Sequence, residues 1–175
     1  ANLQVIQRAR NDPERDEAAA GLLISVDTAT RLVGQLMTLS RLDPQDARDP
    51  ALQTYDLQHF LAKQVPEFSL LAERKQLNFT CNLQVASCLM NPDTLAIMLR
   101  NLLDNAVRYT PVGGQIELAC GSVDGRVFLR VSDSGPGIPE EMREKVFERF
   151  FRLPGASASG SGLGLSIVKS IVRSH

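Results

Sequence analysis

The stretch NLLDNAVRY, residues 101–109, decides the fold of this chain. It ends a longer helix predicted over 93–109, because apolar residues recur there at helical spacing without an internal proline. At about 100° per residue, the leucines fall on one side of the helix and the polar residues on the other. The polar side comprises Asn101, Asp104, Asn105 and Arg108.

That polar side predicts a site for a metal and a phosphate. Asparagine is a poor helix former, so two asparagines four residues apart on one helix need an explanation. The amide oxygens of Asn101 and Asn105 are neutral, hard ligands that suit Mg²⁺, a metal that shares phosphate oxygens. Arg108 can reach a phosphate, and Tyr109 can stack beside a base. For this helix taken alone, a solvated polar face is an equal alternative.

The segment DSGPGI, residues 133–138, follows a strand predicted over 126–132. By period two, Asp133 shares a face with the apolar residues of that strand, where a carboxylate needs a hydrogen-bond donor. The 6-amino group of adenine is such a donor. Gly135 and Gly137 allow the backbone to pass close to a ligand. The alternative is a plain turn that the aspartate caps.

Two further segments predict a phosphate site around a loop. Residues 155–162 are glycine, serine and alanine only, so we expect a mobile lid that leads into a helix over 163–174. Backbone amides at a helix N-terminus, preceded by glycines, bind anions. Arg149 and Arg152, in the segment FERFFR just before the lid, can reach a γ-phosphate. The alternative is a pair of ordinary surface arginines.

The first third of the chain predicts a separate helical unit. Residues 14–42 contain no proline, and apolar side chains follow a heptad seam that suits a helical bundle. The seam residues are Leu22, Val26, Ala29, Val33 and Leu36. We therefore predict homodimerisation through 14–42, with packing onto the chain's own second half as the alternative.

The predicted organisation is a partial helical hairpin at 1–43, a linker at 44–54 and a second domain at 55–175. In that domain, helices and strands alternate without the rhythm of a parallel sheet, which predicts an α/β sandwich with a mixed sheet. Besides the helices over 93–109 and 163–174, we expect a helix over 56–74 that is interrupted or kinked near Pro66, and a helix over 140–151. The predicted strands are 77–83 and a hairpin of 115–120 with 126–132 around Asp124-Gly125.

Composition argues against several functional classes, among them nucleic-acid-binding, membrane-spanning and zinc-binding proteins. The chain has 175 residues, 43% of them hydrophobic, and a formal net charge of -1, which argues against a nucleic-acid-binding surface. No run of about 18 apolar residues predicts a membrane-spanning helix, and no signal peptide is recognisable. Cys81, Cys88 and Cys120 form no CxxC pair, so we expect reduced, partly buried thiols instead of a zinc site or a disulfide.

The four segments, in this order, resemble the N, G1, F and G2 boxes of sensor histidine kinases, within the GHKL ATPase superfamily. The resemblance covers about residues 55–175, extends to the stretches LLDNAVRYTP, FERFFRLPG and SGLGLSIV, and is nearest to the QseC type. The stretch TLSRL, residues 38–42, resembles the second half of the family's dimerisation and phosphotransfer hairpin. The fold implied is half of a four-helix bundle followed by a GHKL-type α/β sandwich.

The resemblance implies roles for single residues. Asn105 would bind Mg²⁺ with support from Asn101, Asp133 would read adenine, and Tyr109 and Ile138 would line the base. The phosphates of ATP would meet arginines and the backbone of the G2-like segment. The full predicted site is Asn101, Asn105, Arg108, Tyr109, Asp133, Gly135, Gly137, Ile138, Arg149, Arg152, Gly160, Ser161, Gly162, Leu163, Gly164 and Leu165.

The function implied is that of a two-component kinase core. The whole protein would transfer the γ-phosphoryl of ATP to a histidine, and from there to a response regulator receiver domain. The whole protein would be a homodimeric sensor of the bacterial inner membrane, and this chain would be part of its cytoplasmic portion. A non-catalytic nucleotide-binding regulator and another type of GHKL ATPase are the alternatives.

Two departures from the family pattern stand out. The only histidines are His59 and His175, and neither lies in the histidine box that carries the phosphoacceptor in the family. Relatives also continue beyond residue 175 with a hairpin that completes the sheet. We therefore expect this chain to be a fragment of a longer protein and to be unable to phosphorylate itself.

Overall fold

The computed structural model describes residues 52–154 and 160–174, and six single positions nearer the N-terminus. The chain divides into two compact units, Ala1–Arg41 and Leu42–His175. The six single positions belong to the first unit, and all are helical. Three of them, Leu22, Val26 and Val33, lie on the predicted heptad seam; Leu22 is partly exposed, and Val26 and Val33 are each 55% exposed. The other seam residues lie outside the described residues, and so does most of the predicted linker.

Helix α3, Leu57–Arg74, confirms the helix predicted near the start of the second unit. The carboxylate of Asp56 caps it by accepting a hydrogen bond from the backbone N–H of His59 at 3.0 Å. The helix continues through Pro66. Its buried residues, Leu57, Leu61, Phe68 and Ala72, lie at helical spacing and form one apolar face.

The main sheet is mixed, as predicted. It contains β2 (Asn78–Leu83), β4 (Gln115–Val123) and β5 (Arg126–Asp133) in the order β2-β4-β5. Strand β2 pairs with β4 in parallel, and β4 pairs with β5 antiparallel. Asp124 and Gly125 join β4 to β5 with φ values of 52° and 74°. Positive φ at both central residues is the geometry of a tight hairpin turn, so the predicted hairpin is confirmed.

A second, two-stranded sheet was not predicted. It pairs β1 (Gln53–Asp56) antiparallel with β3 (Ser87–Met90), and Tyr55 lies opposite Cys88. Strand β1 begins inside the range predicted as linker. Each strand has only four residues and no clear alternation of apolar with polar side chains. Such short strands are stabilised by a partner that is distant in sequence, so local sequence patterns do not reveal them.

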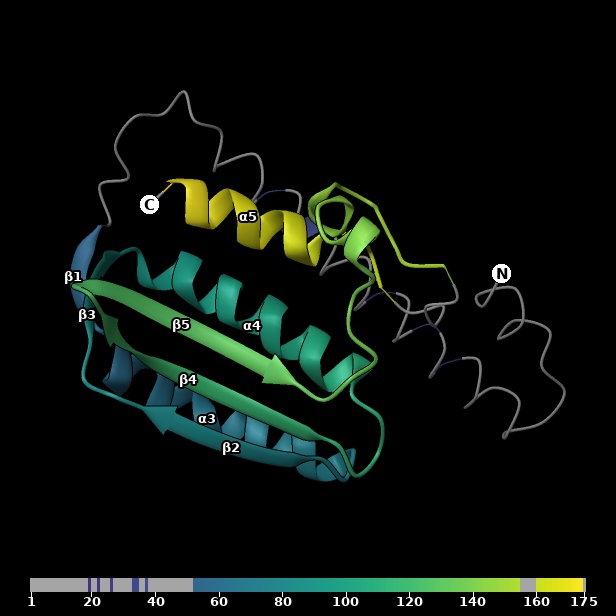
Figure 1. The fold of residues 1–175 in the computed structure, drawn as a ribbon, viewed down its shortest axis with the longest axis horizontal. Helices are drawn as coiled ribbons and strands as arrows, with labels where there is room; N and C mark the ends of the chain where they lie inside the picture. The colour runs from purple at the N-terminus through teal and green to yellow at the C-terminus, as the bar shows by residue number, and fades with distance from the viewer. Residues whose placement is uncertain are drawn as a thin grey trace, which may run out of the picture. The chain divides into compact units, whose positions relative to one another are not determined.

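Two helices position most of the predicted site. Helix α4 runs over Pro92–Tyr109 and α5 over Gly164–Ser174, which confirms both predicted helices. Asn91 caps α4 by accepting from the N–H of Asp93 at 2.9 Å. Figure 1 shows α4 between α3 and α5, with the strands running along it. The core consists of fully buried side chains from α4, β4, α5 and the residue just before α5: Leu95, Leu99, Leu103, Ile116, Leu118, Leu163, Ile167 and Ile171.

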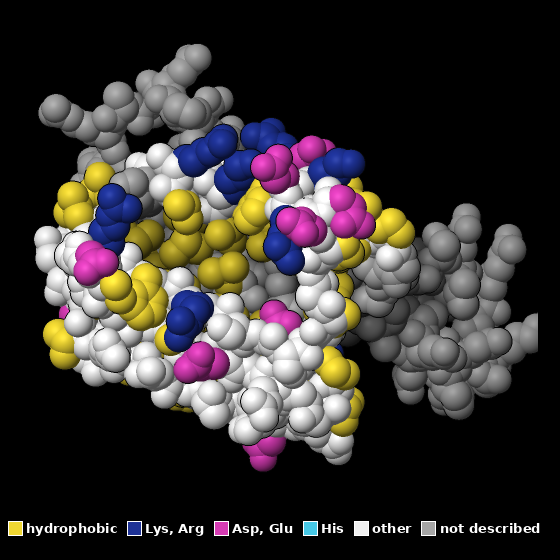
Figure 2. All heavy atoms as spheres, viewed as in Figure 1, with side chains coloured by type: hydrophobic (Ala, Val, Ile, Leu, Met, Phe, Trp, Pro, Cys, Tyr) yellow, Lys and Arg dark blue, Asp and Glu magenta, His cyan; other side chains and the backbone are white. Residues whose placement is uncertain are grey.

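Strand β5 lies at one edge of the sheet in the described part of the chain. Hydrophobic side chains gather in a hollow between α5 and β5 on the face seen in Figure 2. Val127 of β5 is 38% exposed. The apolar side of β5 is therefore only partly covered.

The helix predicted over 140–151 is wrong. Two short 3-10 turns, Glu140–Met142 and Lys145–Phe147, occupy that range instead. Val146 is the one buried residue of these turns, and no side chain caps either of them. The segment therefore lacks the continuous apolar face and the cap that stabilise an α-helix in a folded protein.

No helix in the described part of the chain has the length and apolarity needed to cross a membrane. The cysteines there form no disulfide. Cys81 is exposed, Cys88 is partly exposed and Cys120 is buried in β4. Burial raises the pKa of the Cys120 thiol, so this side chain stays protonated and serves as a small apolar residue.

Candidate nucleotide-binding site

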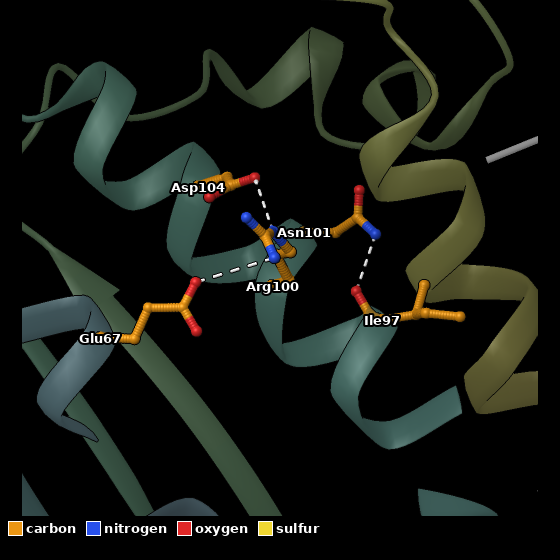
Figure 3. A network of polar contacts seen from close by, with 5 residues as sticks. All are labelled: Glu67, Ile97, Arg100, Asn101 and Asp104. Atoms are coloured by element: carbon orange, nitrogen blue, oxygen red, sulfur yellow. Dashed lines mark hydrogen bonds and ion pairs between the residues drawn. The ribbon is translucent and has the colours of Figure 1, made fainter. Parts of the chain in front are cut away.

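The two asparagines of α4 lie against the first turn of α5. Asn101 Nδ2 donates to the carbonyl oxygen of Ile97 at 2.8 Å, which fixes its amide along α4 (Figure 3). A Cβ built on Gly164 would lie 2.9 Å from Asn101 Oδ1 and 3.6 Å from Asn105 Nδ2. A side chain at residue 164 would force Asn101 or the start of α5 to shift. The structure therefore joins the first and last predicted segments.

An ion-pair network lies on a neighbouring side of α4. Arg100 is 3.7 Å from Glu67 Oε1 on α3 and 4.0 Å from Asp104 Oδ2 one turn further along α4 (Figure 3). Side chains that are 30% to 63% exposed contribute little stability through such pairs. The network does place Asp104 beside Arg100, so this member of the predicted polar side is already engaged.

The end of β5 folds back against the end of α4. The N–H of Gly135 donates to Asp133 Oδ1 at 2.9 Å. A Cβ on Gly135 would lie 2.7 Å from that oxygen and 3.0 Å from the carbonyl oxygen of Tyr109. Gly137 has a φ of 73°, which favours glycine at the next turn. The structure thus brings Asp133 next to Tyr109.

The environment predicted for Asp133 is wrong. We expected a carboxylate on a buried apolar strand face, where it would be costly without a donor. Asp133 is exposed instead, at the end of β5. The exposed carboxylate is hydrated, so it needs no ligand to offset a cost of burial. It is accessible to a ligand. Ile138 is 37% exposed and Tyr109 39%, so both are also accessible.

The glycines before α5 contact the other segments. Gly160 lies so close to the guanidinium of Arg108 that a Cβ would overlap it. Gly162 has a φ of 69°, and a Cβ there would lie 2.7 Å from the backbone of Phe150. The N–H of Phe150 donates to the carbonyl oxygen of Gly162 at 2.9 Å. The third and fourth segments are therefore hydrogen-bonded to each other beside Arg108.

The start of α5 has the form of an anion site. Leu163 is fully buried, and its N–H donates to the hydroxyl of Ser161 at 3.2 Å. The first amides of an α-helix have no partner within the helix and carry its positive dipole end. Here those amides belong to Gly164, Leu165 and Ser166, directly beside Asn101.

The third segment packs against α5, and its two arginines are exposed. Val146 is buried, and Lys169 of α5 lies 5.5 Å from the ring centre of Phe147. Arg149 and Arg152 are both exposed. The described residues show no contact that brings Arg149 to α4, so its phosphate role stays a prediction. Residues 155–159 of the predicted lid lie outside the described residues.

One residue near the site was not predicted. The Lys75 ammonium, just beyond α3, donates to the carbonyl oxygens of Val107 at 2.6 Å and Arg108 at 2.8 Å. Nothing in the sequence distinguishes Lys75 from other lysines near helix ends. Only the fold shows that this lysine reaches a second helix 32 residues away.

Comparison with known proteins identifies the family. Residues 90–175 match the family described as histidine kinase-, DNA gyrase B-, and HSP90-like ATPase. The structure of the cytoplasmic segment of histidine kinase QseC is 30% identical in sequence, with a TM-score of 0.56 over 86% of this chain and 80% of that one. This chain belongs to the sensor histidine kinases. The prediction from its four segments is confirmed.

Sensor histidine kinases also match over almost the whole sequence. Sensor protein QseC of Escherichia coli O157:H7 is 39% identical over 98% of this chain, and the chain spans 38% of that protein's length. Full-length ShkA, solved in complex with AMPPNP, gives a TM-score of 0.76 at 26% identity over 99% of this chain and 37% of ShkA. The mixed α/β fold predicted for the second unit is therefore that of a histidine kinase ATPase domain.

Proposed function

We propose that this chain is the ATP-binding kinase core of a two-component sensor histidine kinase. The site would lie between α4, residues 133–138 and the start of α5. The observation that carries the proposal is the convergence of the predicted segments: Gly164 lies against Asn101, and Gly160 against Arg108. These residues are far apart in sequence, and the polar side chains that face the glycines are not needed to pack the core. A binding site explains why they lie together.

The residues present fit a magnesium ion shared with phosphates. Asn105 is partly exposed beside Gly164, and its amide oxygen is a ligand type that Mg²⁺ accepts. No cluster of acidic, histidine or cysteine side chains in the described residues could hold a metal alone. Such a site suits a metal that arrives with its nucleotide, with Asn105 as protein ligand and Asn101 holding the adjacent surface. Bound Mg²⁺ would neutralise charge on the phosphates.

The base would be read at the last residue of α4, Tyr109, and the turn that follows β5. Asp133 uses Oδ1 to accept from Gly135, which orients the carboxylate, and an oxygen can accept from the adenine 6-amino group. Tyr109 and Ile138 offer exposed apolar surface on either side of the turn. We assign adenine recognition to these three residues, with Gly135 and Gly137 providing room for the base.

The phosphates would lie between α4 and the start of α5. Arg108 provides positive charge, Arg149 and Arg152 would approach with the lid, and the amides of residues 160–165 would donate to phosphate oxygens. The role of all these groups is to position the γ-phosphoryl and to stabilise charge that develops on it. The ATP analogue in the ShkA complex supports a nucleotide in this fold.

The acceptor would be a histidine other than His59 and His175. The phosphoryl would pass from ATP to that histidine in a helical hairpin, then to an aspartate of a response regulator receiver domain. Dimerisation through 14–42 would supply the bundle, and the whole protein would be an inner-membrane sensor with this portion in the cytoplasm.

Isothermal titration with Mg·ATP and with ATP plus a metal chelator tests the proposal. We expect saturable binding of ATP that tightens with Mg²⁺, since the metal links Asn105 to the phosphates. No binding of either form by a folded chain would contradict the proposed function. Equal affinity with and without Mg²⁺ would remove the metal from it.

One observation favours a second candidate, a nucleotide-binding regulator without kinase activity. Neither His59 nor His175 lies in a phosphoacceptor box. Such a regulator would bind ATP equally well, so binding alone does not separate the two functions. Transfer of labelled phosphate to a supplied acceptor hairpin does separate them.

A further inference from the structure

The last turn of α4 is held from outside the helix. The carbonyl oxygens in the last turn of a helix have no partner within it. Here the carbonyl of Ala106 accepts from both the N–H and the hydroxyl of Thr110, at 3.0 and 2.7 Å. The carbonyls of Val107 and Arg108 accept from the ammonium of Lys75, at 2.6 and 2.8 Å. A side chain from the end of α3 therefore completes the end of α4.

An ammonium group is well suited to this position. It has three donors and no acceptor, so it can serve two carbonyls at once. Its positive charge also lies at the negative end of the α4 dipole. Lys75 is half-buried, and no carboxylate in the described part of the chain forms an ion pair with it. Among the described residues, the ammonium therefore interacts with the C-terminal end of α4 and with no carboxylate.

The connection after α4 has its own backbone hydrogen bonds. The N–H of Gly113 donates to the carbonyl of Gln76 at 3.0 Å, and the N–H of Asn78 donates to the carbonyl of Gly114 at 2.8 Å. These bonds do not involve the Lys75 side chain. Loss of the ammonium would therefore loosen the last turn of α4 while the loop after it stays attached to β2.

We propose that Lys75 is a positioning residue for the nucleotide site and acts through Arg108. The ammonium holds the backbone carbonyl of Arg108, and the guanidinium of the same residue lies against Gly160 at the approach to α5. Fixing the backbone of Arg108 sets the direction from which its side chain meets a phosphate. The proposal rests on the proposed function, because it assumes that a nucleotide binds beside Arg108.

The first test compares three lysine variants in the full 175-residue chain. Lys75→Met keeps an unbranched apolar side chain but removes the ammonium, and Lys75→Arg keeps a charged donor. Lys63→Met is the matched control, because Lys63 is an exposed lysine of the same helix α3. Titration with Mg·ATP should give a Kd about 5- to 20-fold higher for Lys75→Met, as expected for a lost charged hydrogen bond. Lys63→Met should match the parent, and Lys75→Arg should recover part of the affinity.

The second test separates positioning from a general loss of stability. Urea unfolding shows the fraction of folded protein under the conditions of the titration, so each Kd refers to folded chain. If Lys75 acts through Arg108, the double variant Lys75→Met/Arg108→Met binds about as weakly as Arg108→Met alone. A merely structural lysine would weaken both backgrounds by the same factor.

Three results would overturn the proposal. One is a Kd for folded Lys75→Met equal to that of the parent, and another is a double variant whose losses multiply. The third is a folded parent chain that binds no Mg·ATP, which removes the proposed function and this proposal together. The first two results leave the proposed function intact, so the failures are distinguishable.

Discussion

Gly164 and Asn101 lie in contact across the α4–α5 junction, where a Cβ on Gly164 would come within 2.9 Å of Asn101 Oδ1. The amide of Asn101 cannot simply turn away, because its nitrogen donates to the carbonyl of Ile97. The glycine therefore determines how closely the first amides of α5 approach the asparagines of α4. A single methyl group added at residue 164 would disturb this spacing.

Gly164→Ala should weaken Mg·ATP binding by about tenfold or more, since the methyl group displaces Asn101 or the start of α5. Alanine is otherwise favourable in a helix, so the free energy of unfolding should change by about 1 kcal/mol or less. Titration and urea unfolding check the two expectations. Val172→Ala, an exposed change in the same helix, serves as the control. Full affinity in Gly164→Ala would show that the close approach does not matter.

Asn105→Ala should cost about 1–3 kcal/mol of Mg·ATP binding energy, the range for a charged partner left without its ligand. The loss should largely disappear when ATP is titrated without Mg²⁺, because Asn105 acts through the metal. Calorimetry under both conditions measures the difference. An unchanged affinity for Mg·ATP would remove Asn105 from the site.

Asp133→Asn tests base recognition at nearly constant size. A carboxylate only accepts hydrogen bonds, whereas an amide can turn its NH₂ group toward the adenine 6-amino group. We expect weaker binding of ATP, while GTP, which has a carbonyl at that position, should gain relative to ATP. Competition titrations of the two nucleotides give the ratio. A folded variant with the parent's affinity for ATP would contradict the assignment.

Dimerisation through 14–42 should depend on the apolar seam. Val26→Asp with Val33→Asp places two charges on side chains that are half exposed in the single chain, so the folded monomer should tolerate them. Sedimentation equilibrium should show a dimer for the parent and a monomer for the double variant. A parent chain that remains monomeric at high concentration would contradict the predicted homodimer.

Incubation with labelled ATP should give no phosphohistidine on this chain alone, because neither His59 nor His175 lies in a phosphoacceptor box. A supplied hairpin that carries the histidine box should become labelled, since the nucleotide site is present. Acid-labile label that maps to His59 or His175, and disappears in the matching glutamine variant, would contradict the first expectation. ATP binding without transfer to the hairpin would instead favour the non-catalytic regulator.

Much of the fold follows from local patterns. The apolar spacing of α4 and α5, and the Asp124-Gly125 turn between β4 and β5, are signals contained in a few neighbouring residues. The predictions that failed concern segments whose structure depends on residues distant in sequence. Strands β1 and β3 are stabilised by pairing across more than 30 residues, and residues 140–151 resemble a helix but lack a buried face in the folded chain.

The sequence by itself determined which residues can bind a nucleotide. The sequence shows two asparagines on one helix face, an aspartate before glycines and a glycine-rich helix start. The chemistry of these residues can be recognised without knowing the fold. Only the tertiary structure decided their mutual distances: Gly164 against Asn101, Gly135 against Tyr109, and Lys75 at the end of α4. The physical reason is that hydrogen-bonding capacity belongs to a side chain, whereas contact depends on how packed helices and strands bring distant residues together.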